Sequence, residues 1–304
     1  MNARRPGAHA SARVEAQAKL NLLLRVGKRE ASGYHQLVTL FQRIALADSV
    51  LVRVAGRARS LDCAGAGVAA VEENLAWRAA VAFAAAAGWP GGFAIEIHKH
   101  IPVGGGLGGG SADAAAVLRA LNALAPRPLD PATIGDVALG LGADVPYLLS
   151  GHPLALGTGR GERLTALAPL PARDVVLLVP PFGVSSAEAF ALLAASRSGK
   201  PTATEGPLLL REPLTWEVVA AHATNDLESV VFTQHPELGR LRDAAERTGA
   251  CMARMTGSGS TIFGVYGRTD TDPHGSGLLT QLASERALLI ETTTLERVAP
   301  VVLD

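Results

Sequence analysis

The sequence predicts an α+β protein of two domains, and three observations lead to this expectation. The chain has 304 residues, which exceeds the usual size of a single domain. Strand-like and helix-like segments follow one another without the regular β–α–β succession of a doubly wound sheet. A glycine-rich stretch near residue 160 gives way to the apolar run "VVLLVP". We therefore expect a disordered tail over residues 1–13, an N-terminal domain over 14–160 and a C-terminal domain over 161–304.

The N-terminal domain is expected to open with a strand over residues 14–26. One face is apolar throughout (Val14, Ala16, Ala18, Leu20, Leu22, Leu24 and Val26), and Lys19 and Asn21 share the other face. Both polar side chains should therefore point away from the core. Further strands are expected at "SVLVRVAG" near residue 50 and at "GFAIEIHKHI".

Helices should follow these strands. Asn74 is placed to cap a helix over 75–87, and a second helix over 112–125 is ended by Pro126 and Pro128. Asp130 with Pro131 opens a third, which ends near "LGLGADVPY". The stretch "GHPLALGTGRGER" is expected to be a loop.

The C-terminal domain is expected to be a sandwich of ferredoxin-like type. Its strands are predicted over 175–179, 252–256, 262–266 and 287–291, and its helices over 186–195, 237–248 and 277–286. A proline-rich stretch over 196–213 is expected to be a surface loop.

Composition and charge argue against several classes of function. Lys and Arg together number 28, as do Asp and Glu, so the formal net charge is zero. A balanced chain lacks the electrostatic attraction that nucleic acids and acidic membranes usually exploit. The two cysteines match no metal-ligand spacing, the N-terminal residues do not resemble a secretory signal, and no apolar run reaches membrane-spanning length. We expect a cytoplasmic protein without nucleic-acid or membrane partners.

The stretch "IPVGGGLGGGSADAAAVLRALN" over residues 101–122 predicts an anion site. A strand, a run of glycines and a helix start let backbone N–H groups converge on a phosphate, and the helix N-terminus adds partial positive charge. The Walker A loop does not fit, because it needs a lysine directly before the serine, and Ser111 follows Gly110 with no lysine in the loop. The dinucleotide pattern is met by Gly104, Gly106 and Gly109, but Asp130 lies in a proline-bounded loop where a ribose-binding acid is not expected. A flexible linker fits poorly between an apolar strand and a helix.

Three ordered stretches resemble the signatures of the GHMP kinases, which include galactokinase, homoserine kinase and mevalonate kinase. They are "PVGGGLGGGSADAA", "AQAKLNLLLRVGKREASGYHQL" and "ARMTGSGSTIFGVY". This resemblance implies a ribosomal-protein-S5-like N-terminal domain and ATP-dependent phosphoryl transfer. The pairing "KLNLLL…GYH" and the stretch "GADVPYLLSG" are most similar to the branch that phosphorylates the 2-hydroxyl of a methylerythritol unit carrying a cytidine diphosphate group.

The resemblance also implies catalytic roles. Asp144, in "GLGADVPY", matches the family's catalytic base, although the same residue alone would suit a helix cap or turn. Lys19 matches the catalytic lysine, whose charge would hold Asp144 ionised and neutralise the developing charge on the phosphoryl group. A solvated strand lysine is the alternative interpretation.

Substrate contacts follow from the same resemblance. On the acceptor side, Asn21 and His35 match contact positions, Tyr34 and Phe190 match aromatics that sandwich the cytosine ring, and Gly257, Ser258 and Gly259 match a loop over the acceptor's phosphates. On the ATP side, Lys99 and Asn74 match positions near the adenine nucleoside. The phosphate loop comprises Pro102, Gly104, Gly105, Gly106, Gly108, Gly109, Gly110 and Ser111. Ser111 is also the candidate ligand of Mg²⁺.

Some alternatives remain open from the sequence. Phe190 could be a core residue, Asn74 only a helix cap, and residues 257–260 a plain tight hairpin. Gln36 stands where the family usually has an acidic residue, and Ser186 stands where a threonine is common. Another acceptor within the family, or a nucleotide-binding module without activity, would share the loops. We expect a monomer or a weak homodimer.

Overall fold

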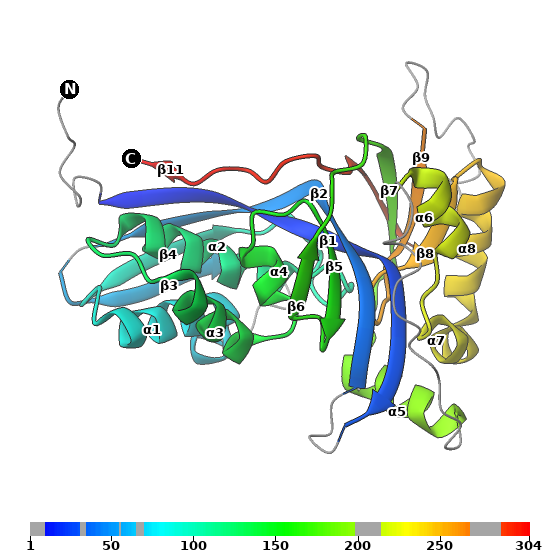
Figure 1. Cartoon of the computed structure of the whole chain (residues 1–304), viewed down its shortest axis with the longest axis horizontal. Helices are drawn as coiled ribbons and strands as arrows, with labels where there is room; N and C mark the ends of the chain where they lie inside the picture. Colours follow the sequence, from blue (N-terminus) through cyan, green and yellow to red (C-terminus); the bar gives the residue numbers. More distant parts are fainter. Residues whose placement is uncertain (1–9, 31–34, 55, 65–69, 198–213, 268–286) are drawn as a thin grey trace.

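The computed structural model describes residues 10–30, 35–54, 56–64, 70–197, 214–267 and 287–304. These residues form two β-sheets with helices packed against them, which confirms the α+β class (Figure 1). The first sheet and its helices hold most of the N-terminal half, and the second sheet lies beside them with the helices of the C-terminal half.

The first sheet is built on two long antiparallel strands, β1 (Ser11–Arg29) and β2 (His35–Arg53). The strand order is β11-β1-β2-β4-β3, and β2 also pairs with β5, which pairs with β6. On the side away from β1, residues 49–53 of β2 pair with β4 and residues 37–42 pair with β5. The remaining strands are β3 (Arg59–Ala64), β4 (Phe93–His98), β5 (Leu154–Gly159), β6 (Arg163–Ala166) and β11 (Val302–Leu303).

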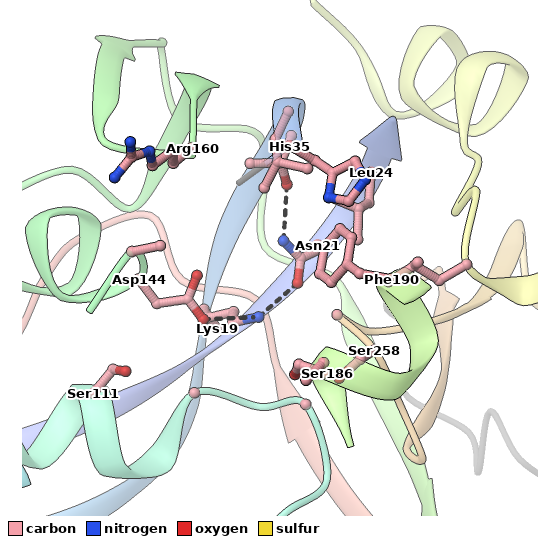
Figure 2. Close-up of a pocket in the computed structure, with 18 of the residues that line it drawn as sticks. Lys19, Asn21, Leu24, His35, Ser111, Asp144, Arg160, Ser186, Phe190 and Ser258 are labelled. Atoms are coloured by element: carbon pink, nitrogen blue, oxygen red, sulfur yellow. Dashed lines mark hydrogen bonds and ion pairs between the residues drawn. The ribbon is translucent and has the colours of Figure 1, made fainter. Parts of the chain in front are cut away.

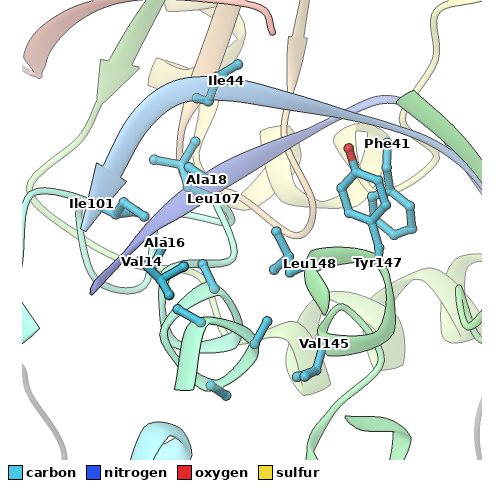
Figure 3. Close-up of a cluster of buried hydrophobic side chains, with 14 of the residues drawn as sticks. Val14, Ala16, Ala18, Phe41, Ile44, Ile101, Leu107, Val145, Tyr147 and Leu148 are labelled. Atoms are coloured by element: carbon cyan, nitrogen blue, oxygen red, sulfur yellow. The ribbon is translucent and has the colours of Figure 1, made fainter. Parts of the chain in front are cut away.

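The helices of this half are η1 (Val71–Glu73), α1 (Leu75–Ala87), α2 (Gly109–Leu124), α3 (Pro131–Leu141) and α4 (Val145–Leu149). The predicted caps are confirmed: the Asn74 side chain accepts from the Ala76 N–H, and the Asp130 side chain accepts from Ala132 and Thr133. Helix α2 is buried over most of its length, since its alanines allow close packing against β1 and α1. Figure 3 shows part of this core, with Val14, Ala16 and Ala18 of β1 near Leu107 and Leu148.

The second sheet is antiparallel, in the order β10-β7-β9-β8. Its strands are β7 (Asp174–Val179), β8 (Met252–Met255), β9 (Ile262–Tyr266) and β10 (Leu288–Thr293). Its helices are α5 (Ser186–Ser196), α6 (Trp216–His222), α7 (Glu228–Gln234) and α8 (Pro236–Arg247). The apolar cluster between them includes Leu24 and Val26, so the far end of β1 packs into the second core.

The structure corrects several expectations. Ser11–Arg13 are paired within β1, not part of a disordered tail, because Ala12 is buried between Val52 and Leu303. The stretch predicted as a loop, residues 151–163, contains β5 and ends at the first residue of β6. Its glycines suggested a loop, but a Cβ on Gly157 would lie 2.8 Å from the Phe41 ring, so the glycine serves strand packing. Strand β3 and helices α4, α6 and α7 were not predicted.

The predicted domain boundary at residue 160 does not coincide with the division between the sheets. Strands β6 and β11 come after residue 160 in the sequence but belong to the first sheet. The division into domains over 14–160 and 161–304 therefore stays a prediction. Residues 1–9, most of the proline-rich stretch and the helix predicted over 277–286 lie outside the described residues. Within the part of the chain that the structure describes, no helix is long and apolar enough to cross a membrane.

Candidate active site

A cavity of about 760 Å³ brings most of the predicted site residues together (Figure 2). Its wall is formed by β1, β2, the glycine loop before α2, the start of α4, helix α5 and the loop between β8 and β9. The predicted residues that line it are Lys19, Asn21, His35, Gly104, Gly106, Gly108, Gly109, Gly110, Ser111, Asp144, Phe190, Gly257 and Ser258. Segments far apart in the sequence therefore converge on one site.

Lys19 lies at the centre of a polar chain. Its Nζ is 3.3 Å from Asp144 Oδ2 and donates to Asn21 Oδ1 at 2.6 Å. The side chain shares a face with Asn21, as the strand pattern predicts, yet it is only 3% exposed because the glycine loop covers that face. The Lys19 backbone N–H donates to the Leu107 carbonyl at 3.0 Å. The interpretation as a solvated strand lysine is therefore wrong.

Asp144 directly precedes α4, and its carboxylate makes no side-chain bond that caps this helix. The carboxylate is instead directed at Lys19 (Figure 2). The other end of α4 is held by Arg43, which is 1% exposed and donates to the carbonyls of Tyr147, Leu148, Ser150 and His152. Burial lowers the pKa of Arg43 to about 10. The segment that carries Asp144 is thus fixed at both ends.

The glycine loop joins β4 to α2, as expected for an anion site. Gly104, Gly106 and Gly108 have positive φ values of 77°, 77° and 76°, which glycine adopts without strain. Helix α2 begins at Gly109 with no side-chain cap, so the N–H groups of its first turn have no partner from a capping side chain. Such a turn, open to a cavity, suits a phosphate. Ser111 lies on the same wall (Figure 2).

The loop between β8 and β9 meets the glycine loop. A Cβ on Gly106 would lie 2.2 Å from the Thr256 carbonyl oxygen, and the Thr261 N–H donates to the Gly105 carbonyl at 3.2 Å. Ser258 Oγ lies 2.7 Å from Ser186 Oγ at the start of α5. A plain hairpin would need none of these contacts; they hold the loop against the glycine loop and place Gly257 and Ser258 in the cavity wall.

Phe190 lines the cavity from α5 (Figure 2), and its partly buried side chain also packs against the second apolar core. Its ring stacks on His35, with centroids 5.4 Å apart and planes 21° from parallel. An aromatic face in a partly apolar cavity suits the flat ring of a nucleobase. Tyr34, the predicted second aromatic, lies outside the described residues.

Five predicted residues do not line the cavity: Asn74, Lys99, Pro102, Gly105 and Gly259. Asn74 uses its side-chain oxygen to cap α1. Roles of these residues toward the nucleotide stay predictions.

Lys99 bridges two buried carboxylates behind the loop. Its Nζ lies 2.5 Å from Asp48 Oδ2 and 2.6 Å from Asp113 Oδ2. Burial acts to lower the pKa of Lys99, but the two carboxylates together raise it. Burial raises the pKa of Asp113 to about 7, against the opposing effect of Lys99. This cluster ties β2, the end of β4 and α2 together.

Several lining residues were missed from the sequence. Thr39 and Phe41 lie on β2 across from β1, and Leu24, Leu37 and Leu227 form an apolar part of the wall. Arg160 comes from the loop between β5 and β6. The alternation of Leu37, Thr39 and Phe41 is a strand signal that extending the strand predicted near residue 50 toward the N-terminus could have found.

A dedicated metal cage is absent from the described part of the chain, where no three His, Cys, Asp or Glu side chains gather as possible ligands. A magnesium ion bound with nucleotide takes most of its ligands from phosphate and water. Ser111, at the start of α2, and Asp144, the one carboxylate among the lining residues, face the cavity. The donor set therefore fits a metal that enters with ATP.

Two family models match the chain, "GHMP kinases N terminal domain" over residues 74–152 and "GHMP kinases C terminal" over 213–282. A protein of Solibacter usitatus named 4-diphosphocytidyl-2-C-methyl-D-erythritol kinase is 39% identical over 258 residues, covering 84% of this chain and 81% of the relative. The chain is a GHMP kinase. A kinase of the same name from Anaeromyxobacter dehalogenans is 42% identical over 256 residues, covering 83% of this chain and 79% of the relative.

Solved structures of GHMP kinases share the fold. A crystal structure of 4-(cytidine 5'-diphospho)-2C-methyl-D-erythritol kinase matches with a TM-score of 0.72 and 36% identity, covering 93% of this chain and 98% of the other. A homoserine kinase from Cytophaga hutchinsonii matches with a TM-score of 0.73 at 18% identity and covers the whole of both chains. At that identity the second match supports the fold alone. The two-domain GHMP kinase fold predicted from the three motifs is confirmed.

Proposed function

We propose that this chain transfers the γ-phosphoryl group of ATP to the 2-hydroxyl of 4-diphosphocytidyl-2-C-methyl-D-erythritol, a step of the non-mevalonate isoprenoid pathway. The observation that carries the proposal is the Lys19–Asp144 pair, 3.3 Å apart in a cavity shared with the glycine loop. Relatives between 36% and 42% identical bear the name of this kinase, which supports the choice of acceptor.

The residues can be given roles that balance the reaction. The Asp144 carboxylate accepts the proton of the acceptor hydroxyl, the hydroxyl oxygen attacks the γ-phosphorus, and ADP leaves. Lys19, beside the Asp144 carboxylate, offsets negative charge on the transferred group. The N–H groups of the glycine loop and of the first turn of α2 hold the phosphates of ATP. Bound Mg²⁺ would neutralise phosphate charge, with Ser111 as its protein ligand.

The acceptor would lie along β1 and α5. Phe190 offers one face for cytosine, and the ring of His35, now stacked on Phe190, would move aside or contact the base. Tyr34 is proposed as the second face of the sandwich. Asn21 would contact the polyol, and the loop over Gly257, Ser258 and Gly259 would bind the diphosphate.

We further propose that the enzyme works in the cytoplasm, where ATP and cytidine nucleotides are available, as a monomer or weak homodimer. The balanced charge supports the absence of a nucleic-acid partner.

The test is ADP release from the purified chain with Mg²⁺ and ATP, offered one acceptor at a time. We expect turnover with the cytidylyl compound and none with homoserine, mevalonate or galactose. Turnover with one of the other three would support kinase activity but contradict the proposed binding of cytosine by Phe190 and Tyr34. No turnover with any of the four would favour a nucleotide-binding module, for which the Lys19–Asp144 pair has no evident use.

A further inference from the structure

Thr39 is a buried hydroxyl in the cavity wall that has no role in the reaction as described so far. It lies on β2, is 1% exposed and stands opposite Leu24 in the pairing of β1 with β2. Its Oγ1 donates to the Leu23 carbonyl at 2.9 Å and accepts from Asn21 Nδ2 at 2.8 Å. Its polar contacts therefore lead to Asn21 and, through Asn21, to Lys19.

These contacts allow one orientation of the Asn21 amide. A hydroxyl has a single hydrogen, and the Leu23 carbonyl can only accept, so the Thr39 hydrogen is committed there. The Thr39 oxygen can then face only a donor, which must be the NH₂ of Asn21. At the other end of the amide, the Lys19 ammonium is a donor without acceptors and requires Oδ1, which it contacts at 2.6 Å.

A flipped amide would be penalised at both ends. It would set the NH₂ group against the Lys19 ammonium and the carbonyl against an oxygen whose hydrogen is already in use. Thr256 adds a weaker preference in the same direction, because its Oγ1 accepts the Asn21 backbone N–H at 3.2 Å and lies 3.4 Å from Asn21 Oδ1. The same Thr256 hydroxyl also lies 3.3 Å from the Gly106 carbonyl, so it is shared. Thr39 thus holds the NH₂ end of the amide, while Lys19 holds its carbonyl end.

We propose that Thr39 is a positioning residue, which fixes the Asn21 amide so that Oδ1 holds the Lys19 ammonium beside Asp144. Without the Thr39 hydroxyl, the Asn21 NH₂ group loses its acceptor and the amide is held only at its carbonyl end, so its grip on the Lys19 ammonium loosens while the contact of Lys19 with Asp144 remains. The ammonium would then be drawn toward Asp144 and away from its present place between the two groups. The catalytic consequence rests on the proposed kinase function, whereas the orientation of the amide does not.

The orientation is tested without substrate. The full chain labelled with ¹⁵N-asparagine gives side-chain NH₂ signals in NMR, and the Asn21 pair is identified by its loss in Asn21→Ala. We expect Thr39→Val, which keeps the shape and removes the hydroxyl, to shift this pair and speed its exchange with solvent. Thr39→Ser should leave the pair in place.

Thr261→Val is the matched control, because Thr261 is fully buried and its hydroxyl has no hydrogen-bond partner among the described residues. It should leave the Asn21 pair unshifted. An unshifted Asn21 pair in Thr39→Val would overturn the proposal.

The catalytic consequence is tested by steady-state kinetics with the cytidylyl acceptor. We expect Thr39→Val to lower kcat by about 10- to 100-fold, because the Lys19 ammonium is misplaced, and to leave KM for ATP unchanged. Thr39→Ser should recover most of the rate. In an Asn21→Ala background, Thr39→Val should have no further effect. If Thr39→Val lowered kcat as much in the Asn21→Ala background as in the unaltered chain, Thr39 would act independently of Asn21, and the inference would be overturned.

The two proposals fail in different ways. If the unaltered chain turns over no acceptor, the proposed function fails, while the NMR comparison still decides the orientation.

Discussion

At the scale of single residues, the site depends on one buried cation with two acceptors. Lys19 meets Asp144 and Asn21, and its stem passes close to the glycine loop. Lys19 and Asp144 could be predicted because each lies in a motif with a chemical requirement. The strand that carries Thr39 could have been found from its alternation, but the contact of Thr39 with Asn21 depends on strand pairing, and the place of Arg160 depends on a turn that brings distant residues to the cavity.

Gly108→Ala tests the approach of the loop to Lys19. The added Cβ would lie 3.1 Å from both Cγ and Cε of Lys19, at a backbone φ of 76° that alanine rarely adopts. We expect kcat to fall by about 100-fold through displacement of the ammonium. The control is Gly135→Ala in α3, where nothing lies within 4 Å and the change should stabilise the protein by about 0.5–1 kcal/mol. Equal rates for the two variants would contradict the account of Lys19.

At the scale of elements, the site is held by buried charges behind it. Arg43 secures the end of α4, and Lys99 joins Asp48 to Asp113 beneath the glycine loop. The helices could be predicted from caps, as Asn74 and Asp130 show. Strand β5 could not be predicted in this way, because its glycine content suggested a loop, and only the fit of Gly157 against Phe41 explains the strand.

Arg43→Met tests the anchor of α4. The change leaves four carbonyls without their donor, so we expect the free energy of unfolding to fall by about 2–4 kcal/mol, measured by urea denaturation. Arg43→Lys should recover only part of the loss, because an ammonium cannot match the planar array of donors. If Arg43→Met were as stable as the unaltered chain, the buried guanidinium would not be an anchor of α4.

Asp113 gives the cluster under the loop a pH dependence. Because its folded pKa is raised to about 7 from 3.8, the folded state binds a proton that the unfolded state has lost. The stabilising contribution is therefore complete below about pH 4 and is lost as the pH rises through 7, at about 1.4 kcal/mol per pH unit at most. The groups that face Asp113 are Lys99, Asp48 and Cys63.

The measurement compares the unaltered chain with Asp113→Asn by urea denaturation between pH 5 and pH 8. The stability of the unaltered chain relative to the variant should fall across this range. A difference that is constant with pH, or that grows as the pH rises, would contradict the predicted direction.

At the scale of the whole molecule, the cavity exists because two halves meet over β1. This strand passes from the first core, at Val14 and Ala18, into the second, at Leu24 and Val26, and carries Lys19 and Asn21 between them. The loops from both halves close on each other where Gly106 meets Thr256. The sequence motifs indicated each loop separately, but their contact depends on tertiary packing and was not predicted.

The measurement that tests the central claim most directly is the site of phosphorylation, determined by ³¹P and ¹³C NMR of the product made from the cytidylyl acceptor. The account predicts a phosphate on the 2-hydroxyl with the unaltered chain, and no product with Asp144→Asn although ATP still binds. A phosphate on another hydroxyl, or near-normal turnover by Asp144→Asn, would contradict it.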